Sequence, residues 1–371
     1  MSIATGLYSH DSIPSEQWTY QVNGTPTLPL IGINHLLLVS TVVQSNKQKL
    51  ALLTALNWQN GRFLWQKKFS DSYIIGVSAT NQQQFPQSEI DIIVSTQSTD
   101  FLQARGQLVA LDKHGQARWS WSPQNSLRIS APTIANDHII ITVDSERLTW
   151  VDLKSGRQKH STSLPVKASP AAPLWNQGII YIPCQGPNLV AMREDGRLHW
   201  QYTYSEEDNW LDQTPTFANG QLFIPTSNGS LLVLDTDDGA LMWEQQLPTP
   251  NQALSTIHVE NGRFFVGGRS GLYAFSESDT ENKWYFPTER PITAMPILCD
   301  NVLYAVDHDH NVNAIQADTG KLIWQYHTNI ERRIEVTPYM SIHSSRPHII
   351  IADRSGLVRC LIDKPKETKN Y

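Results

Sequence analysis

The chain has 371 residues, of which 40% are hydrophobic and 17% are charged, and its formal net charge is −6. This mildly negative balance, without clustered Lys and Arg, argues against a nucleic-acid-binding surface. No run approaches the roughly 18 apolar residues of a transmembrane helix. The three cysteines, Cys184, Cys299 and Cys360, do not form a disulfide framework or an adjacent pair.

The first seventeen residues, MSIATGLYSHDSIPSEQ, have no basic start, no apolar stretch and no cysteine for lipid attachment. A secretory signal needs the first two of these features. We therefore expect a cytoplasmic protein, with a periplasmic location as the alternative if a signal before Met1 was removed.

A short motif recurs along the chain: an apolar strand, a polar turn usually closed by Gly, and a second strand that ends in Trp. The copies in chain order are ALNWQNGRFLW (Ala55–Trp65), ALDKHGQARW (Ala110–Trp119), VDLKSGRQKH (Val151–His160), AMREDGRLHW (Ala191–Trp200), VLDTDDGALMW (Val233–Trp243), AFSESDTENKW (Ala274–Trp284) and AIQADTGKLIW (Ala314–Trp324). Each copy predicts a β-hairpin, because Asp, Asn or Ser followed by Gly supplies a tight turn.

Two further apolar strands precede each hairpin. One unit, for example, consists of Thr214–Phe217, Gln221–Pro225, Ser230–Leu234 and Ala240–Glu244. No helical periodicity extends over ten residues or more. A four-stranded unit that recurs about every 40 to 54 residues is typical of a β-propeller.

The two ends of the chain predict how the ring closes. The C-terminus supplies three strands, near Glu335–Met340, His348–Ala352 and Gly356–Leu361, without a fourth. The N-terminus supplies one strand around Trp18, in Glu16–Val22, without the first three. Pairing them completes a blade and removes an exposed strand edge. We predict an all-β, eight-bladed propeller over residues 16–362 as a single domain, with an N-terminal extension (1–15) and a charged C-terminal tail (363–371).

The repeated aromatic position is interpreted as structural rather than as a ligand-stacking set, because packing between neighbouring blades requires one large side chain per blade. The eight blade-docking positions are Trp18, Trp65, Trp119, His160, Trp200, Trp243, Trp284 and Trp324.

The skeleton AxDxxTGxxxW resembles the Trp-docking repeat of the pyrroloquinoline-quinone-type β-propellers, and the resemblance covers the chain from about Glu16 to Leu361. That superfamily includes quinoprotein dehydrogenases and also non-catalytic propellers. One of the latter is the lipoprotein subunit of the outer-membrane barrel assembly machinery, similar in length and blade count. The resemblance to the dehydrogenases would imply adjacent disulfide-bonded cysteines, a Trp floor for the quinone and Ca²⁺ held by Glu, Asn and Asp. This sequence has no adjacent cysteines and lacks the long insertions that build such a site, so we predict no cofactor and no bound metal.

Function on a propeller usually resides on the loops of one face. Candidate partner-binding residues lie in three blade-to-blade loops and in one insertion. They are Trp121 (in Trp121–Arg128), Trp210, Glu206 and Asp208 (in Tyr202–Gln213), Arg332 and Arg333 (in His327–Glu335), and Phe101 and Arg105 (in Ser98–Gly106). Loop Trp and Arg are enriched in binding hot spots.

Two polar clusters contain residue types that could bind a ligand or a metal, but a structural interpretation is favoured for both. The acids of the Glu206–Asp208 segment are consistent with a solvated face, although a carboxylate pair is also the chemistry of glycoside hydrolysis or of cation binding. Asp307–His310 (DHDH) contains metal-ligand residue types, but its place in the repeat predicts an exposed polar turn.

Three classes of function remain open at this level. The favoured one is a non-enzymatic scaffold that binds protein partners as a subunit or sensor module of a larger complex, without nucleic acid and without membrane insertion. The second is a propeller that binds a small ligand or a glycan through Trp210, Trp121 and the acidic loop. The third is a quinone-dependent oxidoreductase.

Overall fold

The computed structural model describes residues 14–45, 48–80, 90–99, 105–124, 128–205, 210–211, 213–247, 255–276, 284–308, 311–327, 339–341 and 348–362. All regular elements in these ranges are strands. Within them there is no helix that is long and apolar enough to cross a membrane.

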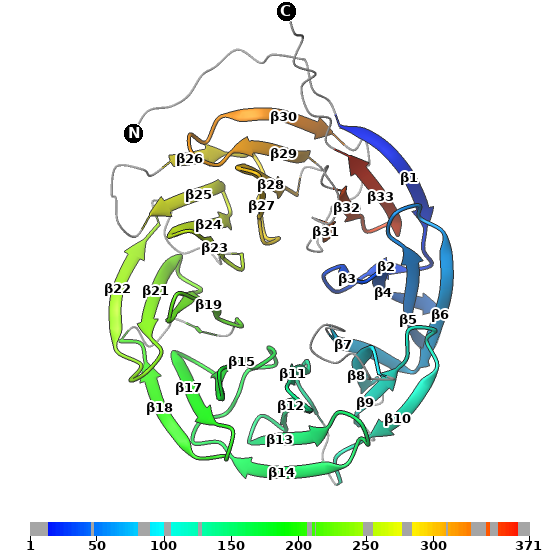
Figure 1. The fold of residues 1–371 in the computed structure, drawn as a ribbon, viewed down its shortest axis with the longest axis vertical. Coiled ribbons are helices and arrows are strands. Elements are labelled where there is room, and N and C mark those ends of the chain that lie inside the picture. The colour runs from blue at the N-terminus through cyan, green and yellow to red at the C-terminus, as the bar shows by residue number, and fades with distance from the viewer. Residues whose placement is uncertain are drawn as a thin grey trace, which may run out of the picture.

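Eight antiparallel sheets form a closed ring, which confirms the prediction of an eight-bladed propeller (Figure 1). In the first four blades, the strands run from the centre outward. Blade 1 contains β2 (Thr25–Pro26), β3 (Ile31–Ile33), β4 (Leu36–Ser45), β5 (Gln48–Asn57) and β6 (Phe63–Ser70); blade 2 contains β7 (Ser72–Ala79), β8 (Ile92–Ser98), β9 (Gly106–Leu111) and β10 (Ala117–Trp121); blade 3 contains β11 (Thr133–Ala135), β12 (His138–Val143), β13 (Arg147–Asp152) and β14 (Gln158–Ser163); blade 4 contains β15 (Leu174–Asn176), β16 (Ile179–Pro183), β17 (Asn188–Arg193) and β18 (Leu198–Thr203).

The remaining blades follow the same order. Blade 5 contains β19 (Thr216–Ala218), β20 (Gln221–Pro225), β21 (Ser230–Asp235) and β22 (Leu241–Gln246); blade 6 contains β23 (His258–Glu260), β24 (Arg263–Gly268), β25 (Gly271–Ser276) and β26 (Trp284–Pro287); blade 7 contains β27 (Ile297–Cys299), β28 (Val302–Val306), β29 (Asn311–Gln316) and β30 (Leu322–His327); blade 8 contains β31 (Tyr339–Ser341), β32 (His348–Ala352), β33 (Leu357–Ile362) and β1 (Ser15–Gln21).

Blade 8 joins the two ends of the chain, as the sequence predicts. β1 pairs with β33 from Ser15 opposite Ile362 to Gln21 opposite Leu357. Figure 1 shows β1 in blue beside β33 in red. Blade 1 differs from the expected pattern, because its innermost strand is divided into β2 and β3, which pair separately with β4.

The hydrophobic core consists of layers between blades rather than of one central mass. In one layer, Leu36 and Leu53 of blade 1 pack against Ile92 and Val94 of blade 2. The same kind of cluster fills each of the other seven seams. Because each layer is shared, no blade buries its apolar faces alone, which is the physical reason that a propeller needs a closed ring.

The Trp of the repeat contacts the turn of the neighbouring blade, as Trp200 of blade 4 shows. Trp200 is 7% exposed, and its Nε1 donates a hydrogen bond at 2.9 Å to the carbonyl of Thr236 in the β21–β22 turn. Its ring lies over Gly239, where a Cβ would come within 2.6 Å of the indole and where φ is +73°. Only glycine fits this turn without strain. Equivalent hydrogen bonds to the neighbouring turn are donated by Trp18, Trp65, Trp119 and Trp284.

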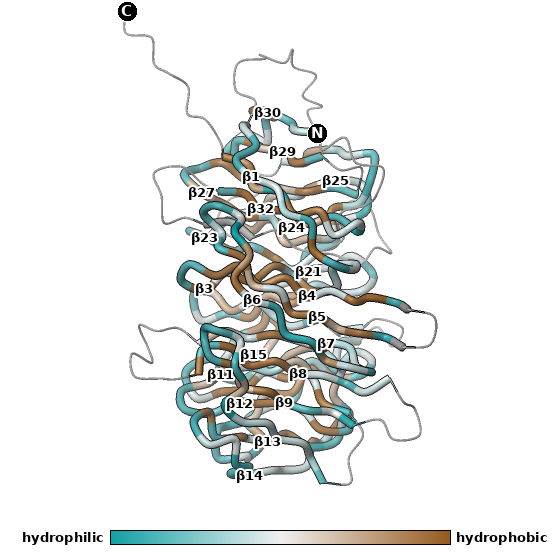
Figure 2. Tube along the Cα trace, turned by 90° about the vertical axis from the view of Figure 1, so that its right-hand side faces the viewer, coloured by the Kyte–Doolittle hydropathy of each residue, from teal (hydrophilic) through white to brown (hydrophobic). Residues whose placement is uncertain are grey.

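Strand direction divides the turns between two faces of the ring. The turns between first and second strands and between third and fourth strands lie on one side, which we call the turn face. The turns between second and third strands and the blade-to-blade connections lie on the other side, the connector face. Figure 2 shows the β4–β5 hairpin projecting on the connector face and the hydrophobic residues concentrated along the strands between the faces.

An ion-pair cluster on the turn face gives blade 3 a pH-dependent stability. Asp152 accepts a hydrogen bond from Ser155 Oγ at 2.6 Å and pairs with Lys159 Nζ at 3.0 Å. These contacts lower the pKa of Asp152 from 3.8 to about 2. Because the folded-state pKa lies below the unfolded one, the stabilisation is complete above about pH 4 and is lost as the pH falls through about 2.

We therefore expect Asp152→Asn to flatten the pH dependence of the free energy of unfolding between about pH 4 and pH 2. Urea denaturation of both proteins at a series of pH values measures this slope. Parallel profiles for the two proteins would show that Asp152 has no such role.

Candidate partner-binding surface

Three of the predicted partner-binding residues lie within the described part of the chain, and all three are on the connector face. Arg105 immediately precedes β9, Trp121 ends β10, and Trp210 lies in the connection between blades 4 and 5. Phe101, Glu206, Asp208, Arg332 and Arg333 lie outside the described residues.

Trp210 is held in place by its backbone while its side chain faces solvent. Its N–H donates to Ser227 Oγ at 2.9 Å, and its carbonyl accepts from Ser227 N–H at 3.2 Å. The next residue, Leu211, is fully buried, and its N–H donates to the Gly186 carbonyl. The Trp210 side chain is nevertheless 49% exposed. An aromatic side chain on a fixed backbone offers a large contact area with few torsions to immobilise, which is the property of an interface anchor.

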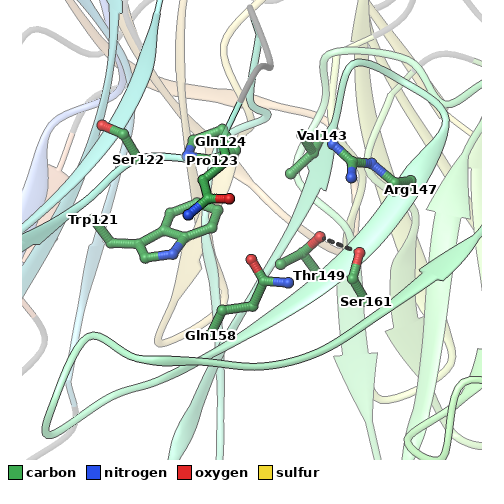
Figure 3. Close-up of a pocket in the computed structure, with 9 residues that line it drawn as sticks. All are labelled: Trp121, Ser122, Pro123, Gln124, Val143, Arg147, Thr149, Gln158 and Ser161. Atoms are coloured by element: carbon green, nitrogen blue, oxygen red, sulfur yellow. Dashed lines mark hydrogen bonds between the residues drawn. The ribbon is translucent and has the colours of Figure 1, made fainter.

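Trp121 forms one wall of a pocket of about 390 Å³ between blades 2 and 3 (Figure 3). The indole also packs against the apolar layer of this seam, so Trp121 is half-buried. Pro123 and Gln124 extend the same wall, and Figure 3 shows Arg147 and Gln158 on the side of blade 3.

The chemistry of this pocket is polar. Arg147 is the one charged residue among those that line it, and Thr149 Oγ1 and Ser161 Oγ lie 3.0 Å apart at its base. The lining residues include no carboxylate. A guanidinium with amides and hydroxyls around it suits a polar or negatively charged group, and the indole offers an apolar surface beside it.

The structure brings only two of the three described partner-binding candidates close together. Arg105 and Trp121 share the connector end of blade 2, because β9 and β10 pair there, with Leu108 opposite Trp121. Trp210 belongs to the seam between blades 4 and 5 instead. The sequence analysis missed Arg147, Gln158 and Ser161. The sequence offers one signal for them. They lie on β13 and β14, the two outer strands of blade 3, and this blade follows the connection that begins at Trp121.

The prediction for the Asp307–His310 segment is wrong for its first residue. Asp307 is 2% exposed and is not part of an exposed polar turn. Its carboxylate accepts hydrogen bonds from the backbone and side-chain nitrogens of Asn311 and from the side chain of Asn313. Burial of a carboxylate is tolerated when hydrogen-bond donors of this kind replace water. Through these contacts Asp307 closes the β28–β29 turn. Asp309 and His310 lie outside the described residues.

The buried thiols do not have the character of nucleophiles. Burial raises the pKa of Cys184 and of Cys360 to about 12, so both are protonated at neutral pH. Among the residues that the structure describes, no group of three metal-ligating side chains converges.

Comparison with known proteins agrees with the ring geometry. A family model described as outer membrane protein assembly factor BamB matches residues 87–210 and 206–347. The protein of that name from Shewanella oneidensis is 29% identical over 161 residues, which are 39% of this chain and 40% of that protein. The chain thus matches less than half the length of this relative. A polyvinylalcohol dehydrogenase from a Pseudomonas species is 22% identical over 387 residues, covering 81% of this chain and 54% of the enzyme.

The crystal structure of BamB from Moraxella catarrhalis shares the fold. The two structures superpose with a TM-score of 0.68 at 18% identity, over 97% of this chain and all of that one. The resemblance to quinoprotein-type propellers is therefore confirmed. Because the family model covers well over half of the sequence, the chain belongs to the family of the outer membrane protein assembly factor BamB.

Proposed function

We propose that this protein is a non-enzymatic scaffold that binds a protein partner through its connector face, as a subunit of an outer-membrane assembly complex. The family supports the general role, since its members are named as assembly factors. The observation that carries the proposal for this chain is Trp210, which is 49% exposed on a backbone fixed by Ser227.

The pocket beside Trp121 supplies a second contact point on the same face. An aromatic wall and Arg147 at one seam, with a presented aromatic ring at another, match the residue types that dominate binding energy in protein interfaces. A partner that touches both seams would span blades 2 to 5 of the ring.

The experiment is affinity purification of the tagged full-length chain from its native cell, followed by mass spectrometry of co-eluting proteins. We expect a stoichiometric partner that is lost or reduced about tenfold with Trp210→Ala, which is the effect of removing one hot-spot residue. Leu198→Ala is the matched control, because Leu198 is also 49% exposed but lies on β18 at the turn-face end.

Equal partner recovery with both variants would refute the role of Trp210. Absence of any stoichiometric partner from the wild-type chain would refute the stable-complex scaffold as a whole.

We also propose the periplasmic side of the outer membrane as the location. The names of the relatives place them in outer-membrane protein assembly, and none of the comparisons supports the cytoplasmic prediction. The glycan-binding and oxidoreductase alternatives stay predictions, although the similarity to a polyvinylalcohol dehydrogenase keeps the second one open.

A further inference from the structure

The pocket between blades 2 and 3, which we call the seam pocket, has two short side chains at its base. One residue after the docking position His160, Ser161 of β14 lies opposite Thr149 of β13. In blade 6 the equivalent pair is Tyr273 and Tyr285, whose rings stack with their centroids 4.8 Å apart. Two hydroxyl side chains fill far less space than two phenol rings. The groove at this seam therefore keeps a volume of about 390 Å³, which is within the size range of ligand pockets.

The two walls of the seam pocket differ in their chemistry. Figure 3 shows the Trp121 indole on one side, the Arg147 guanidinium on the other, and the Gln158 amide between Trp121 and Thr149. Thr149 Oγ1 and Ser161 Oγ lie 3.0 Å apart. An occupant therefore meets an aromatic surface at one end, a positive charge at the other, and amide and hydroxyl groups between them.

The charge of the pocket selects a ligand with one negative charge. Arg147 is the one charged residue that lines it. The two acids of the adjoining β12–β13 turn do not line it and have other contacts. Asp144 accepts from the Arg128 N–H at 2.9 Å, and Glu146 pairs with Lys167 at 3.3 Å. A guanidinium has five N–H donors, so a contact with the protein still leaves donors for a ligand. Its planar fork matches a carboxylate, which carries a single charge.

We propose that the seam pocket binds the carboxylate of a Glu or Asp side chain in an acidic segment of the protein partner. The carboxylate pairs with Arg147, and the methylene groups of the acidic side chain lie on Trp121. The Gln158 amide, which both donates and accepts, bonds to the adjacent peptide group. The polypeptide nature of the occupant rests on the proposed function, and the pocket adds the chemistry of the partner to it.

The test titrates the full-length chain, labelled with ¹⁵N in its Trp indoles, with the capped tripeptides Gly-Glu-Gly and Gly-Gln-Gly and with glucuronate. The Trp121 Nε1–H resonance is identified by its absence from the spectrum of Trp121→Phe. We expect the Glu tripeptide to move this resonance and to bind at least about tenfold more tightly than the Gln tripeptide, which has the same shape without the charge. Glucuronate presents a carboxylate on a sugar ring and should bind more weakly than the Glu tripeptide.

Three variants test which residues carry the binding. Arg147→Gln should reduce the affinity for the Glu tripeptide about tenfold and leave the affinity for the Gln tripeptide unchanged, because only the charge-assisted contact is lost. Arg197→Gln is the matched control, since the Arg197 side chain is 83% exposed in the β17–β18 turn on the other face. The double variant Thr149→Tyr/Ser161→Tyr places the ring pair of blade 6 in the pocket and should abolish binding of both tripeptides. Its melting temperature checks the fold, and Arg147→Gln, at an exposed position, decides the matter if the double variant does not fold.

Equal affinity for the two tripeptides, undiminished affinity in Arg147→Gln, or an unmoved Trp121 resonance with every ligand would each overturn the proposal. Tighter binding of glucuronate than of the Glu tripeptide would also overturn it and assign the pocket to an acidic sugar. This proposal and the scaffold proposal fail separately. Partner recovery that depends on Trp210, without any response to the Glu tripeptide, refutes the acidic segment alone. A response to the Glu tripeptide, without a stoichiometric partner in the native cell, refutes the stable-complex scaffold alone.

Discussion

Deleting residues 1–22, which removes β1, should lower the melting temperature of the whole protein by about 10 °C or more. β1 is the outer strand of blade 8, and its loss leaves the edge of β33 unpaired. It also removes Trp18, whose Nε1 donates to the Trp58 carbonyl at 3.1 Å, and Glu16, which pairs with Arg359 at 2.7 Å. Both apolar layers that border blade 8 depend on ring closure, so the effect should spread beyond one blade.

Differential scanning calorimetry measures this effect, and deletion of residues 1–13 is the matched control because it leaves β1 in place. The full deletion should give one cooperative transition at lower temperature. An unchanged melting temperature after loss of β1 would contradict the closure of the ring by this strand.

Replacing Trp200 with Ala should reduce the free energy of unfolding by about 3–5 kcal/mol, the usual cost of truncating a large buried aromatic residue. Trp200 is 7% exposed, contacts Tyr181 at 5.7 Å between ring centroids, and donates to the Thr236 carbonyl. Its removal should open a cavity over Gly239 and weaken the packing between blade 4 and blade 5.

Trp210→Ala is the natural comparison, because the same residue type is deleted ten positions later. The Trp210 side chain is 49% exposed, so its loss should change stability by only about 0.5 kcal/mol or less. Urea denaturation of both variants distinguishes the packing role of the buried Trp200 from the surface position of Trp210. Equal losses would mean that the repeat Trp does not carry the packing between blades.

The fold could be predicted from the sequence because one local motif, a hairpin with a tight turn and a terminal Trp, recurs along the chain. A turn glycine such as Gly239 and the Trp that lies over it are recognisable in a single chain, and their spacing determines the strand count and the closure by Trp18. The sequence analysis did not predict that the innermost strand of blade 1 is divided into β2 and β3, which pair separately with β4.

The candidate sites were less predictable, because they depend on which side chains meet across a seam. The sequence marks His160 as an exception in the repeat, but it does not show that Trp150 lies opposite it. Asp307 was misjudged because its donors, Asn311 and Asn313, become visible only when the turn is folded. Trp210 could be placed in a blade-to-blade connection from the sequence, but its 49% exposure and the burial of Leu211 beside it are visible only in the structure.

The central claim is that the connector face holds a protein partner, and site-specific photo-crosslinking in the native cell tests it most directly. A photoreactive amino acid would replace Trp210 in one strain and Leu198 in another. We predict a single discrete crosslinked partner from position 210, identified by mass spectrometry, and none from position 198. The same crosslinks from both positions, or none from position 210, would contradict the account.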